Sequence, residues 1–454
     1  MRVTILGTGY VGLTTGVCLA YLGHNVTCMD PVEEKIDALR RGSVPIFEPG
    51  LEQLLAEASP RLTFTTRYED AVPGAQVIFI AVGTPPQPDG SPDLRYLQAA
   101  SEGIATHLEG EFTVVVNKST VPIGSANWVE ALIRTAREKH CGGAKGGPRF
   151  TVASNPEFLR EGTALADSLY PDRVVIGADD PHTLETLYTL YRPILDQSFP
   201  APPFLPRPEN LAAVPIVSTD LASAELIKYA ANAFLALKIS FINEAGSLAE
   251  RVGADIREVA RGIGLDQRIG SRFLQAGLGW GGSCFAKDTA ALITTAAEYG
   301  LSMPIVSAAR EVNQRQRLRV VEKLLHELKI LKGRNIGLLG LAFKPNTDDL
   351  RDAPSIDIIK RLLQHGCRIR AHDPVAMERF RREHPDITVE LVEEPKTLFE
   401  SADAVLLITE WHAYAELDWP ALKPAMRTPL VIDGRSFLDR AALVAAGYRV
   451  VSIP

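Results

Sequence analysis

Three pairs of polar residues in this 454-residue chain are spaced four apart, which places both members of a pair on one face wherever the segment is helical. The pairs are Lys228 with Asn232, Cys284 with Asp288, and Glu157 with Glu161. A thiolate is a nucleophile, an ammonium and an amide stabilise an oxyanion, and carboxylates move protons. Together these side chains could carry out covalent catalysis at a carbonyl carbon.

Each pair also has an interpretation without catalysis. Lys228 could belong to a solvent-exposed stripe of its helix, although its apolar neighbours argue against exposure. A lone cysteine is more often an inert buried side chain, but Cys284 follows a Gly-Gly-Ser turn, where a helix N-terminus would favour its thiolate. The two glutamates could form a solvated acidic pair near Arg160. The residues alone leave these alternatives open.

A dinucleotide-binding pattern occupies the first thirty residues. It consists of an apolar strand (3–6), a glycine turn (7–12), a helix (11–22), a second strand (25–29) and the acidic residue Asp30. Glycines let the backbone approach a pyrophosphate at the helix N-terminus. Asp30 would bind the ribose hydroxyls and repel a 2′-phosphate. A plain βαβ unit with a tight turn is the alternative, but every element agrees with the motif, so the pattern predicts NAD rather than NADP.

Further apolar runs predict two doubly wound halves of α/β class. The runs at 77–82 and 112–116 are continuous, which is typical of parallel strands buried on both faces. The C-terminal third repeats the plan, with strands at 335–340, 367–371, 404–409 and 430–433 and a helix at 355–365. We assign no dinucleotide to this second half because it lacks the full glycine fingerprint.

A helix of about 30 residues is predicted between the two halves, from 221 to 251, with Thr219 or Asp220 as its N-cap. It is apolar nearly all round, which indicates burial between domains or against a second subunit.

The expected architecture is therefore two Rossmann-like domains joined by a long central helix. We expect a NAD-binding domain over 1–210, a helical dimerisation region over 211–315 and a C-terminal domain over 316–454. The glycine-rich stretch 141–148 and the proline-rich stretch 198–208 look like surface insertions.

Composition limits the class of protein. Hydrophobic residues make up 46% and charged residues 23%, the usual globular mix, and the net charge of -7 disfavours nucleic acid as a partner. The five cysteines are scattered without metal-ligand spacing, which indicates free thiols in a reducing compartment and no metal site. No apolar run approaches 18 residues, and the N-terminus lacks a signal-peptide pattern. We expect a cytoplasmic enzyme with no membrane partner.

A NAD fold combined with a candidate thiolate narrows the chemistry. A simple dehydrogenase needs no nucleophilic cysteine. A cysteine becomes useful when an aldehyde is oxidised again, because the thiolate forms a thiohemiacetal, a hydride leaves, and water cleaves the resulting thioester.

Five motifs, in this order and spacing, resemble the UDP-glucose/GDP-mannose dehydrogenase family over nearly the whole chain. They are Gly7-Thr8-Gly9-Tyr10-Val11-Gly12, Lys118-Ser119-Thr120-Val121-Pro122, Asn155-Pro156-Glu157-Phe158-Leu159-Arg160-Glu161-Gly162, Glu225-Leu226-Ile227-Lys228-Tyr229-Ala230-Ala231-Asn232 and Gly279-Trp280-Gly281-Gly282-Ser283-Cys284-Phe285. The resemblance implies a homodimer that oxidises the C6 alcohol of UDP-glucose to the carboxylate of UDP-glucuronate in two NAD-dependent steps. It also implies that the C-terminal domain binds the nucleotide sugar.

Two alternatives to this substrate and activity stay open. The same cysteine, lysine and asparagine would serve a sister enzyme acting on GDP-mannose or a UDP-N-acetylhexosamine. A non-catalytic nucleotide-sugar-binding protein could use the same fold, but the complete set of Lys228, Asn232, Cys284 and Asp288 argues against it.

The resemblance also implies roles for individual residues. The catalytic roles are those of Cys284 as nucleophile, Lys228 and Asn232 at the oxyanion, Asp288 in proton transfer, and Glu157 and Glu161 at the sugar and the hydrolytic water, with Thr120 nearby. The implied cofactor contacts are Gly7, Gly9, Tyr10, Val11, Gly12, Asp30, Lys35, Gly83, Thr84, Pro85, Ser119, Thr120, Glu161 and Arg351. The implied substrate contacts are Glu157, Phe158, Leu159, Arg160, Glu161, Lys228, Asn232, Arg272, Phe273, Gly279, Trp280, Gly281, Lys344 and Arg435, with Arg272 given across the dimer.

Overall fold

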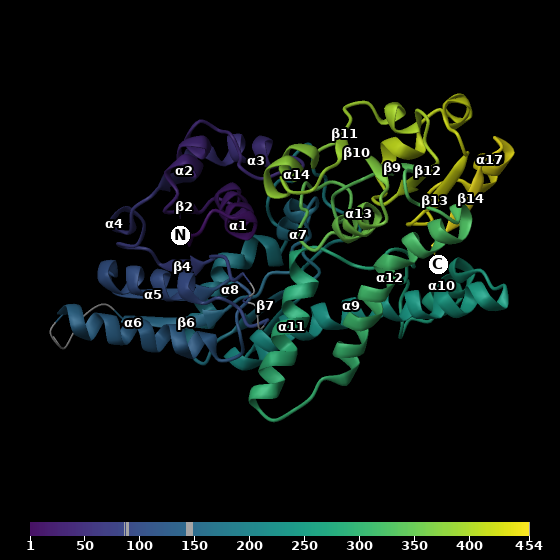
Figure 1. Cartoon of the computed structure of the whole chain (residues 1–454). Coiled ribbons are helices and arrows are strands. Elements are labelled where there is room, and N and C mark those ends of the chain that lie inside the picture. Colours follow the sequence, from purple (N-terminus) through teal and green to yellow (C-terminus); the bar gives the residue numbers. More distant parts are fainter. Residues whose placement is uncertain (86, 88–89, 142–148, 454) are drawn as a thin grey trace. The chain divides into compact units, whose positions relative to one another are not determined.

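The computed structural model describes residues 1–85, 87, 90–141 and 149–453 (Figure 1). The chain divides into two compact units, Met1–Ala231 with Ala290–Tyr299, and Asn232–Thr289 with Gly300–Pro454. The expected glycine-rich insertion lies, apart from Cys141, outside the described residues. The proline-rich stretch 198–208 contains no helix or strand.

The first unit is built on an eight-stranded sheet of order β3-β2-β1-β4-β5-β6-β7-β8. Its strands are β1 (Arg2–Leu6), β2 (Asn25–Met29), β3 (Leu62–Thr65), β4 (Val77–Ile80), β5 (Phe112–Asn117), β6 (Arg149–Ser154), β7 (Val174–Gly177) and β8 (Ile216–Thr219). Only the pairing of β6 with β7 is antiparallel. The strands predicted near β1, β2, β4 and β5 are confirmed, whereas β3, β6, β7 and β8 were not predicted.

The register of the first sheet gathers the carboxyl ends of its central strands at one edge. Leu6 pairs with Met29 on one side and with Ile80 on the other, Ile80 pairs with Asn117, and Asn117 pairs with Ser154. Successive strands are added toward one edge of the sheet from β1 to β3 and toward the other edge from β4 onward. The switch point therefore lies between β1 and β4, which is where open α/β sheets bind ligands. The loops that follow these strands therefore share one edge of the sheet.

Eight helices accompany the first sheet in the described part of this unit. They are α1 (Tyr10–Tyr21), α2 (Glu33–Arg40), α3 (Leu51–Ala58), α4 (Tyr68–Ala71), α5 (Arg95–His107), α6 (Ser125–Cys141), α7 (Ala164–Leu169) and α8 (Pro181–Leu195). Helix α1 is buried continuously from Gly12 to Ala20, because it packs against α3 and α7 as well as against β1 and β2, which explains why its sequence is mostly apolar.

The second unit contains a six-stranded, fully parallel sheet of order β11-β10-β9-β12-β13-β14. Its strands are β9 (Asn335–Leu339), β10 (Arg368–His372), β11 (Glu390–Leu391), β12 (Ala404–Leu407), β13 (Leu430–Asp433) and β14 (Arg449–Ser452). The helices that precede this sheet or connect its strands are α12 (Pro304–Leu328), α13 (Pro354–Gln364), α14 (Met377–Glu383), α15 (His412–Ala415), α16 (Trp419–Leu422) and α17 (Arg440–Ala445). This order is that of β3-β2-β1-β4-β5-β6, so the predicted repetition of the doubly wound plan is confirmed.

Three helices lie between the two sheets in the sequence: α9 (Leu221–Val252), α10 (Ile256–Gly264) and α11 (Ser283–Glu298). Helix α9 has 32 residues, and Asp220 caps it by accepting a 2.8 Å hydrogen bond from the Ser223 amide. The predicted long helix and its cap are confirmed. No helix among the described residues is both long and apolar enough to cross a membrane.

Two glycines of the first turn face different surroundings. A Cβ atom on Gly12 would lie 1.9 Å from the Gly7 carbonyl oxygen, whereas a Cβ on Gly9 would meet no atom within 4 Å. Gly9 has φ of -73°, which an alanine adopts freely. The fold needs glycine at position 12, whereas Gly9 leaves space for a ligand.

We therefore predict opposite effects for two matched substitutions. Gly12→Ala should lower the free energy of unfolding by about 3 kcal/mol, the upper end of overpacking penalties. Gly9→Ala should unfold at the wild-type temperature but lose NAD affinity, because its methyl group would occupy the space that the pyrophosphate needs. Thermal unfolding and a NAD titration followed by protein fluorescence measure both effects. Unchanged NAD affinity in Gly9→Ala would contradict a close approach of the cofactor at this turn.

Candidate active site

The acidic residue at the end of β2 is held beside the glycine turn. Asp30 is buried, and its Oδ2 accepts hydrogen bonds of 2.9 Å from both the amide and the hydroxyl of Thr8. The Lys35 ammonium in α2 lies 3.6 Å from the same oxygen. A carboxylate fixed at this point fits the ribose of NAD, because it can accept from ribose hydroxyls and repels a 2′-phosphate.

The loops after β4 and β5 form the adjoining rim. The Thr84 hydroxyl donates to the Thr120 carbonyl at 2.9 Å, and the Ser119 hydroxyl donates to the Val82 carbonyl at 2.6 Å. The structure thus brings together the two segments that were predicted from separate motifs to contact the cofactor, Gly83–Pro85 and Ser119–Thr120.

A residue that sequence reasoning missed links the glycine turn to the loop after β6. Glu48 is buried, and its carboxylate accepts from the Gly162 amide at 2.6 Å, the Ala164 amide at 2.7 Å and the Tyr10 hydroxyl. Burial raises the pKa of Glu48, although these donors oppose the rise. The contacts fix the end of the loop that contains Glu161. The segment just before α3 carries no pattern from which this role could be read.

Glu157 and Glu161 do not share a helix face, because the segment between β6 and α7 is an irregular loop. The condition for a shared face, a helical segment, is not met for this pair. Glu157 is buried and its Oε1 lies 2.8 Å from the Lys228 ammonium of α9, while its Oε2 accepts from the Leu159 amide at 2.6 Å. Burial alone would raise the pKa of Glu157, but the Lys228 ammonium, with help from the Leu159 amide and the Lys118 ammonium, outweighs burial and lowers it. The interpretations of Lys228 as an exposed stripe and of Glu157 as solvated are therefore wrong.

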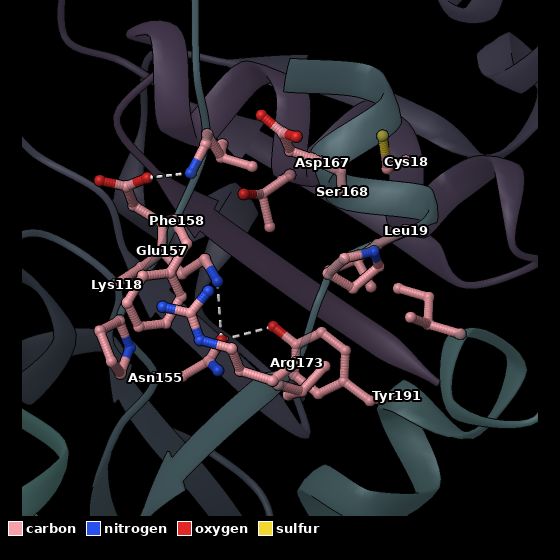
Figure 2. A pocket seen from close by; sticks show the side chains of 16 residues that line it. Cys18, Leu19, Lys118, Asn155, Glu157, Phe158, Asp167, Ser168, Arg173 and Tyr191 are labelled. Atoms are coloured by element: carbon pink, nitrogen blue, oxygen red, sulfur yellow. Dashed lines mark hydrogen bonds between the residues drawn. The ribbon is translucent and has the colours of Figure 1, made fainter. Parts of the chain in front are cut away.

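The neighbours of Glu157 are engaged elsewhere. The Arg160 guanidinium pairs with Asp167 at 2.5 Å rather than with Glu157. The Phe158 ring lies under the Arg173 guanidinium, 3.6 Å from the ring centroid, with the Lys228 ammonium 5.4 Å from that centroid. Figure 2 shows Glu157, Phe158 and Arg173 along one wall of a pocket.

In the second unit, Asn232 of α9 is bound to Asp288 of α11. The Asn232 amide donates to the Asp288 carboxylate at 2.5 Å, and the Lys287 ammonium lies 2.9 Å from the other carboxylate oxygen. Cys284 is the second residue of α11, so the four-residue spacing of Cys284 and Asp288 falls on one helix, as predicted. The partial positive charge at the N-terminus of α11 stabilises negative charge on the sulfur.

The turn before Cys284 is held by α12. The Trp280 amide donates to Asn313 Oδ1 at 2.8 Å, the Asn313 amide donates back to the Trp280 carbonyl at 2.9 Å, and Arg317 donates to the same carbonyl at 2.8 Å. Gly279 has φ of +89°, and a Cβ there would lie 2.3 Å from Asn313 Oδ1. This close approach explains why the turn needs glycine at that position.

Buried polar residues on one face of α12 are further site residues that the sequence analysis missed. Gln316 donates to the Gly277 carbonyl at 2.7 Å, and Arg317 also pairs with Asp352 at 2.6 Å. Together with Asn313 they have the i, i+3, i+4 spacing of one helix face, a signal that was available in the sequence.

Arg435, predicted at the substrate, and Arg351, predicted at the cofactor, both have partners within the second unit. Arg435 donates to the carbonyls of Ile408 at 2.8 Å and Gly279 at 3.1 Å, so it supports the same turn. Arg351 is exposed and pairs with Asp349 at 2.7 Å. Arg272 is exposed and has no ion-pair partner among the described residues.

The predicted site residues divide between the two units. The first unit holds Gly7, Gly9, Tyr10, Val11, Gly12, Asp30, Lys35, Gly83, Thr84, Pro85, Ser119, Thr120, Glu157, Phe158, Leu159, Arg160, Glu161 and Lys228. The second unit holds Asn232, Arg272, Phe273, Gly279, Trp280, Gly281, Cys284, Asp288, Lys344, Arg351 and Arg435.

Cys284 differs from the other cysteines whose side chains are described. Cys18, Cys28 and Cys367 are buried, and burial raises the pKa of Cys18 and Cys28 to about 12 and that of Cys367 to about 11. Cys284 alone among these four is partly exposed. No cluster of three His, Cys, Asp or Glu side chains suited to a metal ion occurs among the described residues.

The second sheet uses its equivalent acidic residue differently. Asp373 follows β10 as Asp30 follows β2, but its Oδ2 accepts from the amides of Leu341 at 2.8 Å and Ala342 at 3.1 Å. The amides that a phosphate would bind in the turn after β9 are therefore already engaged. This agrees with assigning no dinucleotide to the second half.

Three domains of one protein family match most of this chain. Residues 1–195, 222–315 and 337–440 match, respectively, the NAD binding domain, the central domain and the UDP binding domain of the UDP-glucose/GDP-mannose dehydrogenase family. UDP-glucose 6-dehydrogenase YwqF of Bacillus subtilis is 45% identical, covering 100% of this chain and 97% of that protein. UDP-glucose 6-dehydrogenase of Rhizobium meliloti is also 45% identical, covering 100% and 99%.

Solved structures agree with these matches. A UDP-glucose dehydrogenase from Pyrobaculum islandicum has a TM-score of 0.85 at 42% identity, covering 96% of this chain and 94% of that one. A UDP-D-ManNAc dehydrogenase from Pyrococcus horikoshii has a TM-score of 0.83 at 25% identity, covering 100% and 99%. With a NAD-binding first sheet and matches along the full length, the chain belongs to the UDP-glucose/GDP-mannose dehydrogenase family.

Proposed function

We propose that this protein oxidises the C6 alcohol of UDP-glucose to the carboxylate of UDP-glucuronate in two NAD-dependent steps, through a thioester on Cys284. The observation that carries the proposal is the partly exposed Cys284 at the N-terminus of α11, after a turn clamped by Asn313 and Arg317. A thiol held in this way suits nucleophilic attack.

The choice of sugar rests on the relatives. Curated UDP-glucose 6-dehydrogenases are 38% to 45% identical to this chain along its whole length. A UDP-D-ManNAc dehydrogenase is 25% identical, and a GDP-mannose dehydrogenase of Pseudomonas aeruginosa is 31% identical with a TM-score of 0.52. The alternative of a sister enzyme predicts faster turnover of one of those sugars than of UDP-glucose.

Each step is assigned to side chains of this protein. NAD⁺ bound at the first sheet would accept one hydride in each oxidation, so a second NAD⁺ must replace the NADH formed in the first step. Cys284 Sγ bonds to the C6 carbon of the aldehyde, and the Lys228 ammonium and Asn232 amide stabilise the resulting oxyanion. Loss of the second hydride leaves a thioester, from which water displaces the sulfur to give the acid and the free thiol.

Carboxylates accept the protons that the reaction releases and orient the hydrolytic water. Glu157 and Glu161 orient and deprotonate the hydrolytic water, with Thr120 near them. Asp288, which accepts a hydrogen bond from Asn232, takes the C6 hydroxyl proton as the first hydride leaves. A non-catalytic binding protein would have no need of this set.

We further propose a homodimer in the cytoplasm, with 211–315 as its dimerisation region and 316–454 as the nucleotide-sugar domain. Phe234, Phe241 and Leu248 of α9 repeat every seven residues and are 61%, 55% and 63% exposed. Seven-residue spacing places them along one stripe of the helix, the arrangement that pairs two copies of a helix. Arg272, exposed and without an ion pair in the described chain, would serve the partner's site.

The first prediction here concerns stoichiometry and Cys284. Wild-type protein should form two NADH for each UDP-glucose consumed, and Cys284→Ser should reduce turnover at least about 10³-fold because an alkoxide forms less readily than a thiolate. Cys367→Ser, in the same unit, is the control and should retain activity. One NADH per sugar with accumulating aldehyde would disprove four-electron oxidation, and a fully active Cys284→Ser would disprove the thioester.

The second prediction concerns the cofactor. Wild-type kcat/KM should favour NAD over NADP, because the buried Asp30 carboxylate would face the 2′ position, and Asp30→Asn should reduce that preference by about tenfold or more. Lys35→Met is the matched control, since it removes the cation beside Asp30 and should not weaken the preference for NAD. Equal kcat/KM for both cofactors in the wild type would count against Asp30 as the ribose ligand.

The third prediction concerns assembly. Replacing Phe234 and Phe241 together by glutamate should give a monomer in light scattering, because two charges would be buried unpaired in the interface. Tyr96→Glu is the control, since Tyr96 is 55% exposed like Phe241 but lies on α5. A monomeric wild type would refute the dimer.

A further inference from the structure

A second buried lysine, Lys118, lies in the pocket that contains Glu157. Lys118 follows β5 directly, is 9% exposed, and lines a cavity of about 60 Å³ together with Glu157 and Phe158. A cavity of this size admits water, which can satisfy remaining N–H groups of an ammonium.

The Lys118 side chain fixes the start of the loop that contains Glu157. Its Nζ donates to Asn155 Oδ1 at 2.8 Å, and the Tyr191 hydroxyl donates to the same oxygen at 2.5 Å (Figure 2). The Asn155 amide donates in turn to the Val175 carbonyl of β7 at 2.7 Å. Asn155 is therefore held on both sides, two residues before Glu157.

Lys118 also acts on Glu157 through its charge. Both the Lys228 ammonium and, more weakly, the Lys118 ammonium favour the ionised carboxylate. Burial lowers the pKa of Lys118 to about 8, with Glu157 opposing this, so the side chain is largely protonated at neutral pH. The buried side chains of Lys118, Lys228 and Glu157 thus carry two positive charges and one negative charge. The ion pair of Glu157 with Lys228 alone would have no net charge.

An extra cation matters when Lys228 has a second task. In the proposed reaction the Lys228 ammonium must direct its charge to an oxyanion, which weakens its hold on Glu157. A buried carboxylate that loses its only cation takes up a proton rather than stay charged. A second cation nearby prevents this.

We propose that Lys118 is a positioning residue, whose buried ammonium keeps Glu157 a carboxylate while Lys228 serves the reacting oxygen. The proposal rests on the roles given to Glu157 and Lys228 under the proposed function.

Other ionisable groups around Glu157 and Lys228 have partners of their own. Arg160 pairs with Asp167, Arg173 stacks on Phe158, and Glu225 accepts from the amides of Gly124 at 2.6 Å and Ala126 at 3.0 Å. The remaining ionisable groups that line the cavity are Cys18 and Tyr191, whose pKa values burial raises, so both stay neutral.

The test compares pH profiles of kcat with UDP-glucose and saturating NAD. Lys118→Gln removes the charge but keeps a donor for Asn155, and Lys118→Met removes both. Loss of the cation raises the pKa of Glu157, so the fall of kcat on the acid side of the profile (the acid limb) should move to higher pH in both variants, and their loss relative to wild type should grow as the pH is lowered. The KM for NAD should stay near wild type.

Tyr191→Phe is the matched control. It removes the other donor to the same Asn155 oxygen without changing charge, so its acid limb should stay in place. A role for Lys118 in packing alone predicts the same fractional loss at every pH and a similar loss in Tyr191→Phe. Thermal unfolding of all three variants separates lost folding from altered chemistry.

Glu157→Gln separates failure of this proposal from failure of the proposed function. If the acid limb disappears in Glu157→Gln but stays unmoved in Lys118→Gln and Lys118→Met, Lys118 has no such role and the proposed function stands. If the limb persists in Glu157→Gln, Glu157 is not the titrating group, and both its assigned role and this proposal are wrong. A limb that moves with Lys118 and vanishes with Glu157 supports the proposal.

Discussion

The buried ion pair between Lys228 and Glu157 is the interaction on which the arrangement of the first unit's candidate site depends. It joins α9 to the loop after β6 at 2.8 Å, with both side chains out of solvent. Burying two charges costs several kcal/mol per ion, and their attraction repays this only when the geometry is good and other lone pairs are bonded. The Leu159 amide on the second carboxylate oxygen meets part of that need. Such a pair contributes little net stability, which is consistent with a role in chemistry.

The turn before Cys284 also depends on buried polar groups that are hydrogen-bonded, but here the groups are backbone amides and carbonyls rather than charges. Asn313 bonds both the amide and the carbonyl of Trp280, and Arg317 and Gln316 bond carbonyls nearby. A nucleophile is effective only when its position is defined to a fraction of an ångström. Side-chain bonds from one rigid helix, α12, provide that definition for a turn that has no regular structure of its own.

The two sheets share a strand order but not a binding mode. Asp30 and Asp373 follow equivalent strands, yet Asp30 binds the side chain and amide of Thr8, whereas Asp373 binds two successive turn amides. One sheet keeps a carboxylate beside an open glycine turn, and the other closes its turn with the carboxylate. A shared topology therefore fixes where a ligand can bind, and local hydrogen bonding decides which ligand.

Periodicity and glycine spacing by themselves determined the two doubly wound sheets, α9, and the strand ends where Asp30 and Ser119 lie, because these are local patterns. The spacing of Cys284 and Asp288 likewise needed only a helix. The partners of those residues were decided by tertiary structure. Glu48, Asn313 and Lys118 lie far along the chain from the groups they fix, so no local pattern shows which groups those are. Glu157 and Glu161 show the converse, since their four-residue spacing falls in a loop. That loop is held by Glu48 at Gly162 and by Lys118 at Asn155, and only the folded chain brings these partners to it.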